Sequence, residues 1–482
     1  MTAPVLIWFR HDLRLADHAA LTAAVAAGGR VLPVFVLDDA AAGAHRYGAA
    51  SRWWLKRSLA ALAGSLAARG APLLLASGRA ETVIPALADA LGAAEVHAGR
   101  AIEPWARDQT RRVHEALHDA GRVLRLHTTM VLREPHGFLS GSGRPYAVYT
   151  PFAKAMLAAG DPPPPLPAPL AIQGAEPPVG GETLDSLGLY PVAGEPDWAA
   201  GFDAGWQPGE AGAAARLTRF IGALLTDYAK ARNVPGIEGS SGLSPHLRWG
   251  EVSPRQAWHA ARAAPRGPGA EAWLKEILWR EFSHHLLWDR PEMPTRNLRR
   301  EFDAFPWAPD ARLLRAWQRG RTGYPIVDAG MRQLWRIGWM HNRVRMVAAS
   351  LLVKHLLQPW QDGAAWFLDT LLDADLAANS ASWQWVAGCG TDAAPYFRVF
   401  NPVLQGEKFD PDGAYVRRWV PEVARLPRAL LHRPWEAPED VLAAAGLRLG
   451  RDYPRPVIGP AEGRARALDA FATLKRPVDD AA

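Results

Sequence analysis

The chain has 482 residues, 49% of them apolar, so it is longer than one hydrophobic core usually sustains and too apolar to be a disordered polymer. Lysine and arginine outnumber aspartate and glutamate by 55 to 49, an excess that suits a polyanionic partner without requiring one. The single cysteine, Cys389, excludes an intramolecular disulfide framework and an all-cysteine metal site.

The first residues do not read as a targeting segment. Arg10, Asp12 and Arg14 directly follow a short apolar run, so the long apolar region of a signal peptide is missing. Elsewhere no stretch approaches the roughly 20 consecutive apolar residues that span a bilayer. We therefore expect a soluble, cytoplasmic monomer that does not associate with membranes.

Short apolar runs separated by helical segments mark the first part of the chain. The expected strands are Val5–Phe9, Val31–Leu37, Leu73–Ala76, Val96–Ala98 and Val123–Leu126. Between them, Ser51–Arg69 and Glu103–Ala120 have helical spacing. This alternation predicts a doubly wound α/β domain with a parallel sheet, which we place at residues 1–132.

The pattern changes after residue 132. Pro162–Pro165 are four consecutive prolines in a stretch rich in Gly and Pro, and we read 133–212 as a long connector. Helical periodicity dominates from there on, with expected helices at Ala270–Leu287, Val327–Leu357 and Ala364–Leu372. We predict an all-helical second domain over 213–477.

Two segments in the helical half combine polar groups in ways that suggest a ligand. In the loop 239–247, Ser244 and Pro245 suit the N-cap and the first residue of a helix. The free N–H groups of a helix start, together with serine hydroxyls, can bind a phosphate. The alternative is that this segment is a plain helix cap. Asp373 and Asp375 lie in an apolar stretch and need donors or cations if they are buried. A metal site or a turn would also fit, but no third ligand is nearby, and a heterocycle with N–H and hydroxyl donors is equally plausible.

Two further clusters place charges on helices. Arg343 and Arg345 lie about 200° apart around a helix, so one can face outward and the other an internal anion. Glu276, Trp279 and Arg280 share roughly one helix face, either as a site or as a surface ion pair over a Trp. We interpret the adjacent His284 and His285 as structural.

Long segments of this chain resemble the DNA photolyase/cryptochrome flavoprotein family, and specifically class I cyclobutane pyrimidine dimer photolyases. The resemblance runs from WFRHDLRLADH near the amino terminus through most of the helical half, and it is most specific in GYPIVDAGMRQLWRIGWMHNRVRM and LLDADLAANSASWQWVAGCGTDAAPYFRVFNPVLQGEKFD. It implies FAD in the helical domain and DNA containing pyrimidine dimers as the partner, with no metal.

The resemblance also assigns residues. The implied FAD-binding positions are Tyr228, Ser240, Ser241, Gly242, Leu243, Ser244, Trp273, Arg280, Arg345, Asp373, Asp375 and Asn379. The implied lesion and DNA contacts are Glu276, Trp279, Asn342, Arg343, Met346, Trp385 and Gln405. Among these residues, Glu276, Asn342 and Asn379 would be catalytic. Trp383, Trp360 and Trp307 match a chain that carries electrons to the flavin, although each could instead be core.

Some positions bear on the choice of activity and antenna. Asn379 matches the position facing flavin N5, where animal cryptochromes carry Cys and plant cryptochromes Asp, and a neutral amide favours repair over signalling. Asn342 stands where (6-4) photolyases have a second His, which favours the cyclobutane dimer. Glu103 and Pro104 replace the Asn-Glu pair of folate-binding relatives, so the antenna, methenyltetrahydrofolate or a deazaflavin, stays open.

The expected function is therefore light-driven repair, in which excited reduced FAD passes an electron to a flipped-out dimer. A cryptochrome-like blue-light photoreceptor with the same fold is the main alternative. An inactive flavin-binding fold is a third.

Overall fold

A computed structural model describes residues 2–190, 197–392 and 397–474. The chain forms two compact units that interleave along the sequence. The first unit contains residues 1–226, 241–291 and 372–378, and the second contains 227–240, 292–371 and 379–482. The boundaries that we predict for domains at 1–132, 133–212 and 213–477 stay a prediction.

The first unit is built on a parallel sheet of five strands in the order β3-β2-β1-β4-β5. The strands are β1 (Val5–Phe9), β2 (Val31–Leu37), β3 (Leu74–Ser77), β4 (Glu95–Gly99) and β5 (Val123–His127). Val5 lies opposite Val31 on one side and Glu95 on the other, so β1 is central. All five expected strands form, and the doubly wound α/β architecture is confirmed.

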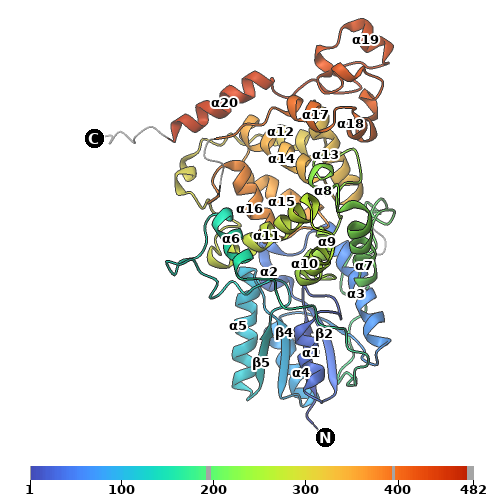
Figure 1. The fold of residues 1–482 in the computed structure, drawn as a ribbon, viewed down its shortest axis with the longest axis vertical. Helices are drawn as coiled ribbons and strands as arrows, with labels where there is room; N and C mark the ends of the chain where they lie inside the picture. The colour runs from blue at the N-terminus through green and yellow to red at the C-terminus, as the bar shows by residue number, and fades with distance from the viewer. Residues whose placement is uncertain (1, 191–196, 393–396, 475–482) are drawn as a thin grey trace, which may run out of the picture. The chain divides into compact units, whose positions relative to one another are not determined.

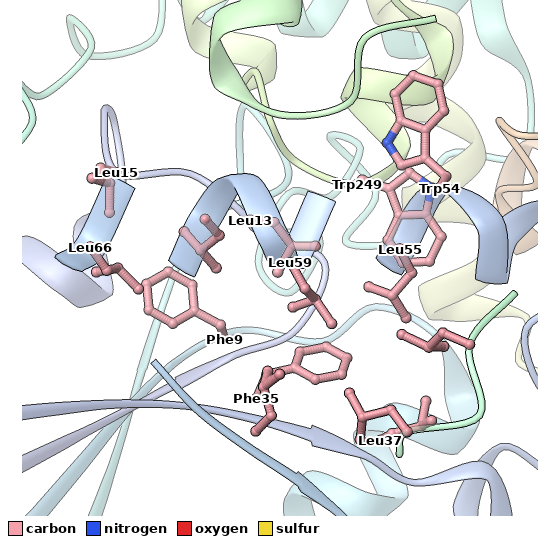
Figure 2. Close-up of a cluster of buried hydrophobic side chains, with 14 of the residues drawn as sticks. Phe9, Leu13, Leu15, Phe35, Leu37, Trp54, Leu55, Leu59, Leu66 and Trp249 are labelled. Carbon is pink, nitrogen blue, oxygen red and sulfur yellow. The ribbon is translucent and has the colours of Figure 1, made fainter. Parts of the chain in front are cut away.

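Helices cover both faces of this sheet, because alternate residues of its strands supply two separate cores. Val5, Ile7 and Phe9 pack on one side, against α3 and α1. Figure 2 shows Phe9, Phe35 and Leu37 of the strands with Leu55, Leu59 and Leu66 of α3. Leu6 and Trp8 pack on the opposite side, against α4 and α5. This burial on both faces explains why β1 and β2 are continuously apolar.

The sheet and the helices that pack on it form the blue to cyan part of Figure 1. The first unit also contains helices from later in the chain. Its helices are α1 (Ala19–Ala26), α2 (Asp39–Ala42), α3 (Ala49–Ala67), α4 (Ala80–Leu91), α5 (Pro104–Asp119), α6 (Tyr149–Ala158), α7 (Glu210–Arg219), α9 (Ser244–Arg248), α10 (Pro254–Ala263) and α11 (Pro268–Asp289), with the short turns η1 (Gly43–His45) and η2 (Phe220–Leu224). Helix α16 (Leu376–Ala387) begins in this unit and continues in the second.

Helices are the main secondary structure of the second unit, which contains none of the five strands. Its helices are α8 (Tyr228–Ala231), α12 (Ala311–Gln318), α13 (Pro325–Ile337), α14 (Asn342–Ser350), α15 (Trp360–Thr370), α17 (Pro402–Phe409), α18 (Ala414–Trp419), α19 (Glu439–Ala444) and α20 (Pro460–Thr473), with the turns η3 (Arg300–Ala304), η4 (Leu351–His355), η5 (Pro421–Val423), η6 (Arg428–Leu430) and η7 (Pro434–Glu436). In the described parts of both units, no helix is long and apolar enough to cross a bilayer.

The prediction of one helix over Val327–Leu357 is wrong. The first part, α13, ends at Gly338, whose φ of 66° is left-handed and whose N–H donates to the Leu334 carbonyl. Helix α14 then starts after His341, whose Nδ1 accepts from the Arg343 N–H. Burial lowers the pKa of His341 to about 4, so the neutral ring that this acceptor role needs is present at neutral pH.

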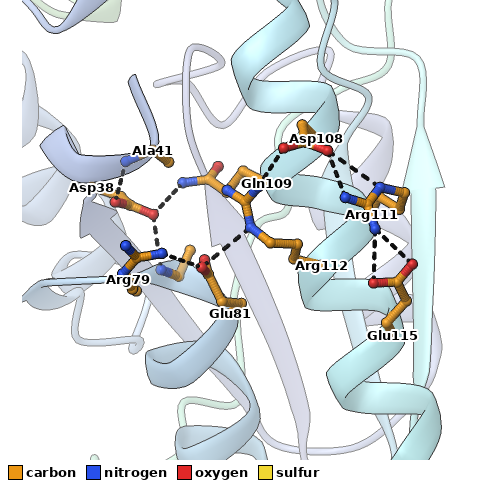
Figure 3. Close-up of polar contacts among 10 residues, drawn as sticks. Asp38, Ala41, Arg79, Glu81, Asp108, Gln109, Arg111, Arg112 and Glu115 are labelled. Carbon is orange, nitrogen blue, oxygen red and sulfur yellow. Dashed lines mark hydrogen bonds and ion pairs between the residues drawn. The ribbon is translucent and has the colours of Figure 1, made fainter. Parts of the chain in front are cut away.

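A polar network fixes the end of β2 to the neighbouring helices. Asp38 accepts from the N–H of Ala41 and of Ala80 and from the amide nitrogen of Gln109, at 2.8 to 3.0 Å. Figure 3 shows this buried group beside the surface ion pairs of α4 and α5. Such exposed pairs contribute little to stability, whereas the buried carboxylate of Asp38 depends on its three donors.

Candidate functional site

Helix α11 carries four of the predicted site residues, all in the first unit. Trp273 is buried against Phe220, with ring centroids 4.6 Å apart. Arg280 donates through Nη1 to the Met130 carbonyl at 2.8 Å. Glu276 is partly exposed, and Trp279 is 37% exposed, an unusual state for so large an aromatic side chain. The helix therefore buries one face along most of its length and exposes the Trp279 ring near its middle.

Asp375 is the most heavily engaged of the predicted carboxylates. Its Oδ1 accepts from the Ala378 N–H at 2.7 Å, and its Oδ2 lies 3.3 Å from Nε2 of His284. Burial alone raises the pKa of Asp375, but His284, Arg248 and Arg280 outweigh that effect and hold the pKa below its ordinary value. Asp375 is therefore an ionised carboxylate at the start of α16. Asp373, two residues earlier, is buried, whereas Asp375 keeps a small exposed fraction.

Our interpretation of His284 as structural is incomplete, because its ring contacts this carboxylate. His284 follows Glu276 and Arg280 at four-residue intervals on α11, so helical spacing could have placed it on the same face. Nδ1 of His284 lies 2.8 Å from the Arg280 carbonyl, which orients Nε2 toward Asp375. The other histidine, His285, packs among Phe138 and Phe152.

The expected serine cap of α9 is not formed. Ser244 is the first residue of this short helix, and Leu243 occupies the N-cap position without a side-chain cap. The Ser241 hydroxyl accepts from the Leu243 N–H at 3.2 Å instead. Gly242 has a φ of +63°, and a Cβ on it would meet Nη1 of Arg216 at 2.6 Å. A loop of this shape therefore requires glycine at that position, and Ser244 stays exposed.

These groups suit a flavin nucleotide. Nη2 of Arg280 is buried and has no hydrogen-bond partner among the described residues, so it can donate to a ligand. Asp375 is ionised and can accept from a heterocycle N–H or a hydroxyl, since each of its oxygens has two lone pairs. The hydroxyl of Ser241 lies on the loop that precedes α9, and that of Ser244 on the first residue of this helix. The donor set of the first unit thus fits FAD chemically.

The second unit holds the remaining flavin candidates. Tyr228 is buried at the start of α8, and Ser240 is partly exposed. The amide nitrogen of Asn379 donates to the Ala364 carbonyl at 3.1 Å, which fixes the orientation of its side chain. Arg345 donates through Nε to the Met340 carbonyl at 2.8 Å and stands 5.9 Å from the centre of the Trp339 ring.

The predicted DNA contacts of the second unit lie on α14, α16 and α17. Asn342 is exposed at the first position of α14, and Met346, Trp385 and Gln405 are partly exposed. Arg343 donates to the Asn233 side chain at 2.6 Å, and its guanidinium stands 4.4 Å from the centre of the Phe409 ring. These contacts hold Arg343 in place without neutralising its charge.

The charge of a second arginine acts on Arg343. Burial and the neighbouring charge of Arg232 both lower the pKa of Arg343. A like charge nearby is unfavourable in the free protein. A bound anion would offset this repulsion.

The three tryptophans of the predicted electron chain differ in burial. Trp383 and Trp360 are buried, and Trp360 donates to the Asn297 side chain at 2.9 Å. Trp307 is half-buried against Phe305, with ring centroids 4.5 Å apart. One further indole was missed from the sequence, since the buried Trp317 lies 6.1 Å from Trp383.

A cavity in the first unit was also missed. It lies where β1, β2 and β4 end, beside the point at which the strand order reverses. Its lining includes the aromatic residues Trp8, Phe35, Tyr47 and Trp105 and the charged residues Arg10, Asp12, Asp38, Glu103, Arg248 and Asp375. Such a position is where open α/β sheets bind ligands, so the strand prediction alone could have indicated it.

Hydrogen bonds fix the protonation of a histidine in this cavity. His11 Nδ1 lies 3.1 Å from Nη1 of Arg248, which can only donate, so Nδ1 is the acceptor. Nε2 then carries the proton and donates to the Tyr47 hydroxyl at 2.7 Å. Burial, together with Arg248 and Arg10, lowers the pKa of His11 well below its ordinary value, which agrees with a neutral ring. Glu103 lies 3.2 Å from Arg248.

Comparison with known proteins agrees with this architecture. Residues 5–170 match a family model described as DNA photolyase, and residues 273–473 match one described as the FAD binding domain of DNA photolyase. The chain is 47% identical to a deoxyribodipyrimidine photo-lyase of Agrobacterium fabrum over 98% of this chain and 99% of that one. It is 38% identical to cryptochrome-1 of Arabidopsis thaliana over 97% of this chain and 70% of that one.

The solved structures give the same result. A bacterial class III photolyase from Agrobacterium tumefaciens superposes with a TM-score of 0.95 at 46% identity, covering 99% of this chain and 98% of that one. The protein is therefore a flavoprotein with an α/β domain and a helical FAD-binding domain of the photolyase type. It belongs to the DNA photolyase/cryptochrome family. The class I subtype that the sequence suggested is not supported, because the matched photolyase structure is described as class III.

Proposed function

We propose that this protein repairs cyclobutane pyrimidine dimers in DNA with light, in the manner suggested by its photo-lyase relatives, and that it resembles class III rather than class I enzymes. The observation that carries the proposal is the exposed indole of Trp279, which lies one helical turn after Glu276 and directly before Arg280 on α11. An exposed flat ring beside a carboxylate suits a base that has left the duplex, since the ring can stack and the carboxylate can hydrogen-bond the base edge.

Each residue of the proposed flavin and lesion sites has a proposed role. Arg280 and Asp375 would hold the flavin heterocycle, and the chemistry that bound, reduced FAD supplies is light-driven electron donation. Glu276 and Asn342 would orient the dimer, with Trp279 and Trp385 against its faces. Asn379 cannot ionise and would leave flavin N5 without an acid. No general acid-base pair among the protein side chains is needed.

A route for electrons and a site for an antenna complete the proposal. Trp307, Trp360 and Trp383 would carry electrons to the flavin. The cavity at the strand ends, lined by Trp105, Tyr47 and Arg248, suits an aromatic antenna with polar substituents. An archaeal relative, from Sulfolobus tokodaii, is described as containing two FAD molecules with a novel light-harvesting cofactor implied. The candidates for the antenna of this protein are methenyltetrahydrofolate, a deazaflavin and a second flavin.

A blue-light photoreceptor is the second candidate, because plant cryptochromes are also similar to this chain. The positive charges of Arg343 and Arg232 favour the enzyme, because they would attract a DNA phosphate, which light signalling does not require. Cytoplasmic location and a monomeric state belong to the same proposal.

Binding to damaged and intact DNA separates phosphate contacts from lesion contacts. Arg343→Ala should weaken binding to both DNAs alike and reduce the salt slope by about one phosphate contact. Trp279→Ala should cost on the order of 1–3 kcal/mol, mainly on dimer-containing DNA. Both variants must retain the FAD spectrum of the wild type. If Trp279→Ala discriminated normally between the two DNAs, the proposed lesion pocket would be wrong.

A further inference from the structure

Trp279 is covered on one face by another aromatic ring. The ring of Tyr149 lies parallel to the indole, with centroids 3.6 Å apart and an interplanar angle of 3°. This is a full face-to-face overlap of two side chains from different helices, α6 and α11. Trp279 nevertheless keeps 37% of its surface exposed, so the remainder of the ring is accessible.

Tyr149 is itself fixed at both ends. Its hydroxyl donates to the main-chain carbonyl of Lys275 at 3.0 Å, four residues before Trp279 on the same helix. Its backbone is the first residue of α6. Because the hydroxyl is bound to α11 and the ring lies on the indole, neither ring can rotate without breaking a contact made by the other.

Core packing does not account for this stack. The buried contact between the two helices is centred on Phe152 and Phe282, whose centroids are 5.4 Å apart and which are both buried. Tyr149 and Trp279 each meet the Phe282 ring edge-on, with centroids 6.0 Å apart. Tyr149 and Trp279 lie at the rim of that contact, where both are partly exposed. An exposed indole would otherwise sample several rotamers, and fixing one of them before binding lowers the entropy cost of binding.

We propose that Tyr149 is a positioning residue for the lesion: stacked on one face of Trp279 and bound to the Lys275 carbonyl, it holds the indole in the orientation that receives a flipped-out base. The inference rests on the proposed function, because it assigns a role within the same lesion site. Tyr149 acts through Trp279 and does not itself contact the reacting atoms.

The test measures affinity for dimer-containing and intact DNA with three variants of the FAD-loaded protein. Tyr149→Ala should weaken binding of damaged DNA by about 3- to 10-fold, the value of an aromatic pair, and leave intact DNA unchanged. Tyr149→Phe keeps the stack and should stay within about twofold of the wild type. Tyr146→Ala is the matched control, because Tyr146 packs on Phe138 and Phe152 in the same segment; it should discriminate normally.

A double-mutant cycle completes the test. In a Trp279→Ala background, Tyr149→Ala should cause no further loss, since the partner through which it acts is gone. Additive losses would overturn the inference, as would equal losses on both DNAs. Tighter binding by Tyr149→Ala would show that the ring obstructs the indole, also overturning it. A wild type that fails to distinguish the two DNAs would overturn the proposed function and this inference together, whereas normal wild-type discrimination with an unaffected Tyr149→Ala overturns the inference alone.

Discussion

Individual buried charges explain much of the first unit's site. Asp375 would be costly to bury in an apolar stretch, and His284, Arg248 and Arg280 offset that cost. The carboxylate also begins α16, since it accepts from the Ala378 N–H. Two functions therefore meet in one side chain, a helix cap and a charge that can hold a ligand.

A substitution that keeps the cap and removes the charge separates these functions. Asp375→Asn retains an oxygen that can accept from the Ala378 N–H, so α16 should still start at the same place. The variant should bind FAD about tenfold or more weakly, because a charge-assisted hydrogen bond is lost. Flavin absorbance of the purified protein and its titration with added FAD measure the change.

Asp17→Asn is the control for this variant. Asp17 is also buried, and it pairs with Arg255 and Ser253 away from the proposed flavin residues. It should reduce stability yet leave the flavin content of the protein unchanged. Full flavin content and wild-type affinity in Asp375→Asn would remove Asp375 from the cofactor site.

At the level of elements, regular segments could be predicted and their junctions could not. Strands buried on both faces are continuous apolar runs, so β1 and β2 were found with correct bounds. The long helix α11 was found within two residues at each end. The break at Gly338 was missed because helical spacing resumes after it, and the α9 cap was misplaced because a serine before a proline is ambiguous.

Parts of the site depend on contacts that no local pattern contains. The pairing of His284 with Asp375 joins residues from two distant segments of the chain. The stack of Tyr149 on Trp279 likewise crosses from the segment that we interpreted as a connector to α11. Local spacing indicates which face a residue occupies but not which segment covers it.

The tryptophans of the second unit, on α15, on α16 and after η3, give a prediction about electron transfer. Trp307→Phe should slow light-driven reduction of oxidised FAD, because the half-buried Trp307 is the outermost indole of the proposed chain. Repair by chemically reduced enzyme should stay nearly intact. Time-resolved absorbance of the flavin under blue light measures the first effect, and a repair assay after dithionite reduction measures the second.

Trp317→Phe is the matched control for this route. Trp317 is buried 6.1 Å from Trp383 but is not part of the proposed chain, so its loss should leave photoreduction near the wild-type rate. Slow photoreduction in Trp317→Phe with a normal rate in Trp307→Phe would move the electron route to Trp317.

For the whole molecule, the residues that the resemblance assigns to the flavin and the lesion come from both units. Trp279, Arg280 and Asp375 belong to the first unit, and Asn342 and Asn379 belong to the second. The resemblance assigns all five to one flavin and one lesion, and the chain is similar to both photolyases and cryptochromes. Activity on DNA is what distinguishes the two possibilities.

The most direct test of light-driven repair illuminates the reduced, FAD-loaded protein with blue light in the presence of an oligonucleotide that contains one thymine dimer. We expect the dimer to disappear and intact thymines to be restored in the light, with no change in the dark or when the same oligonucleotide is illuminated without the protein. If the protein holds reduced FAD, as its absorption spectrum would show, and the dimer remains after illumination, the repair function is contradicted and the photoreceptor is favoured.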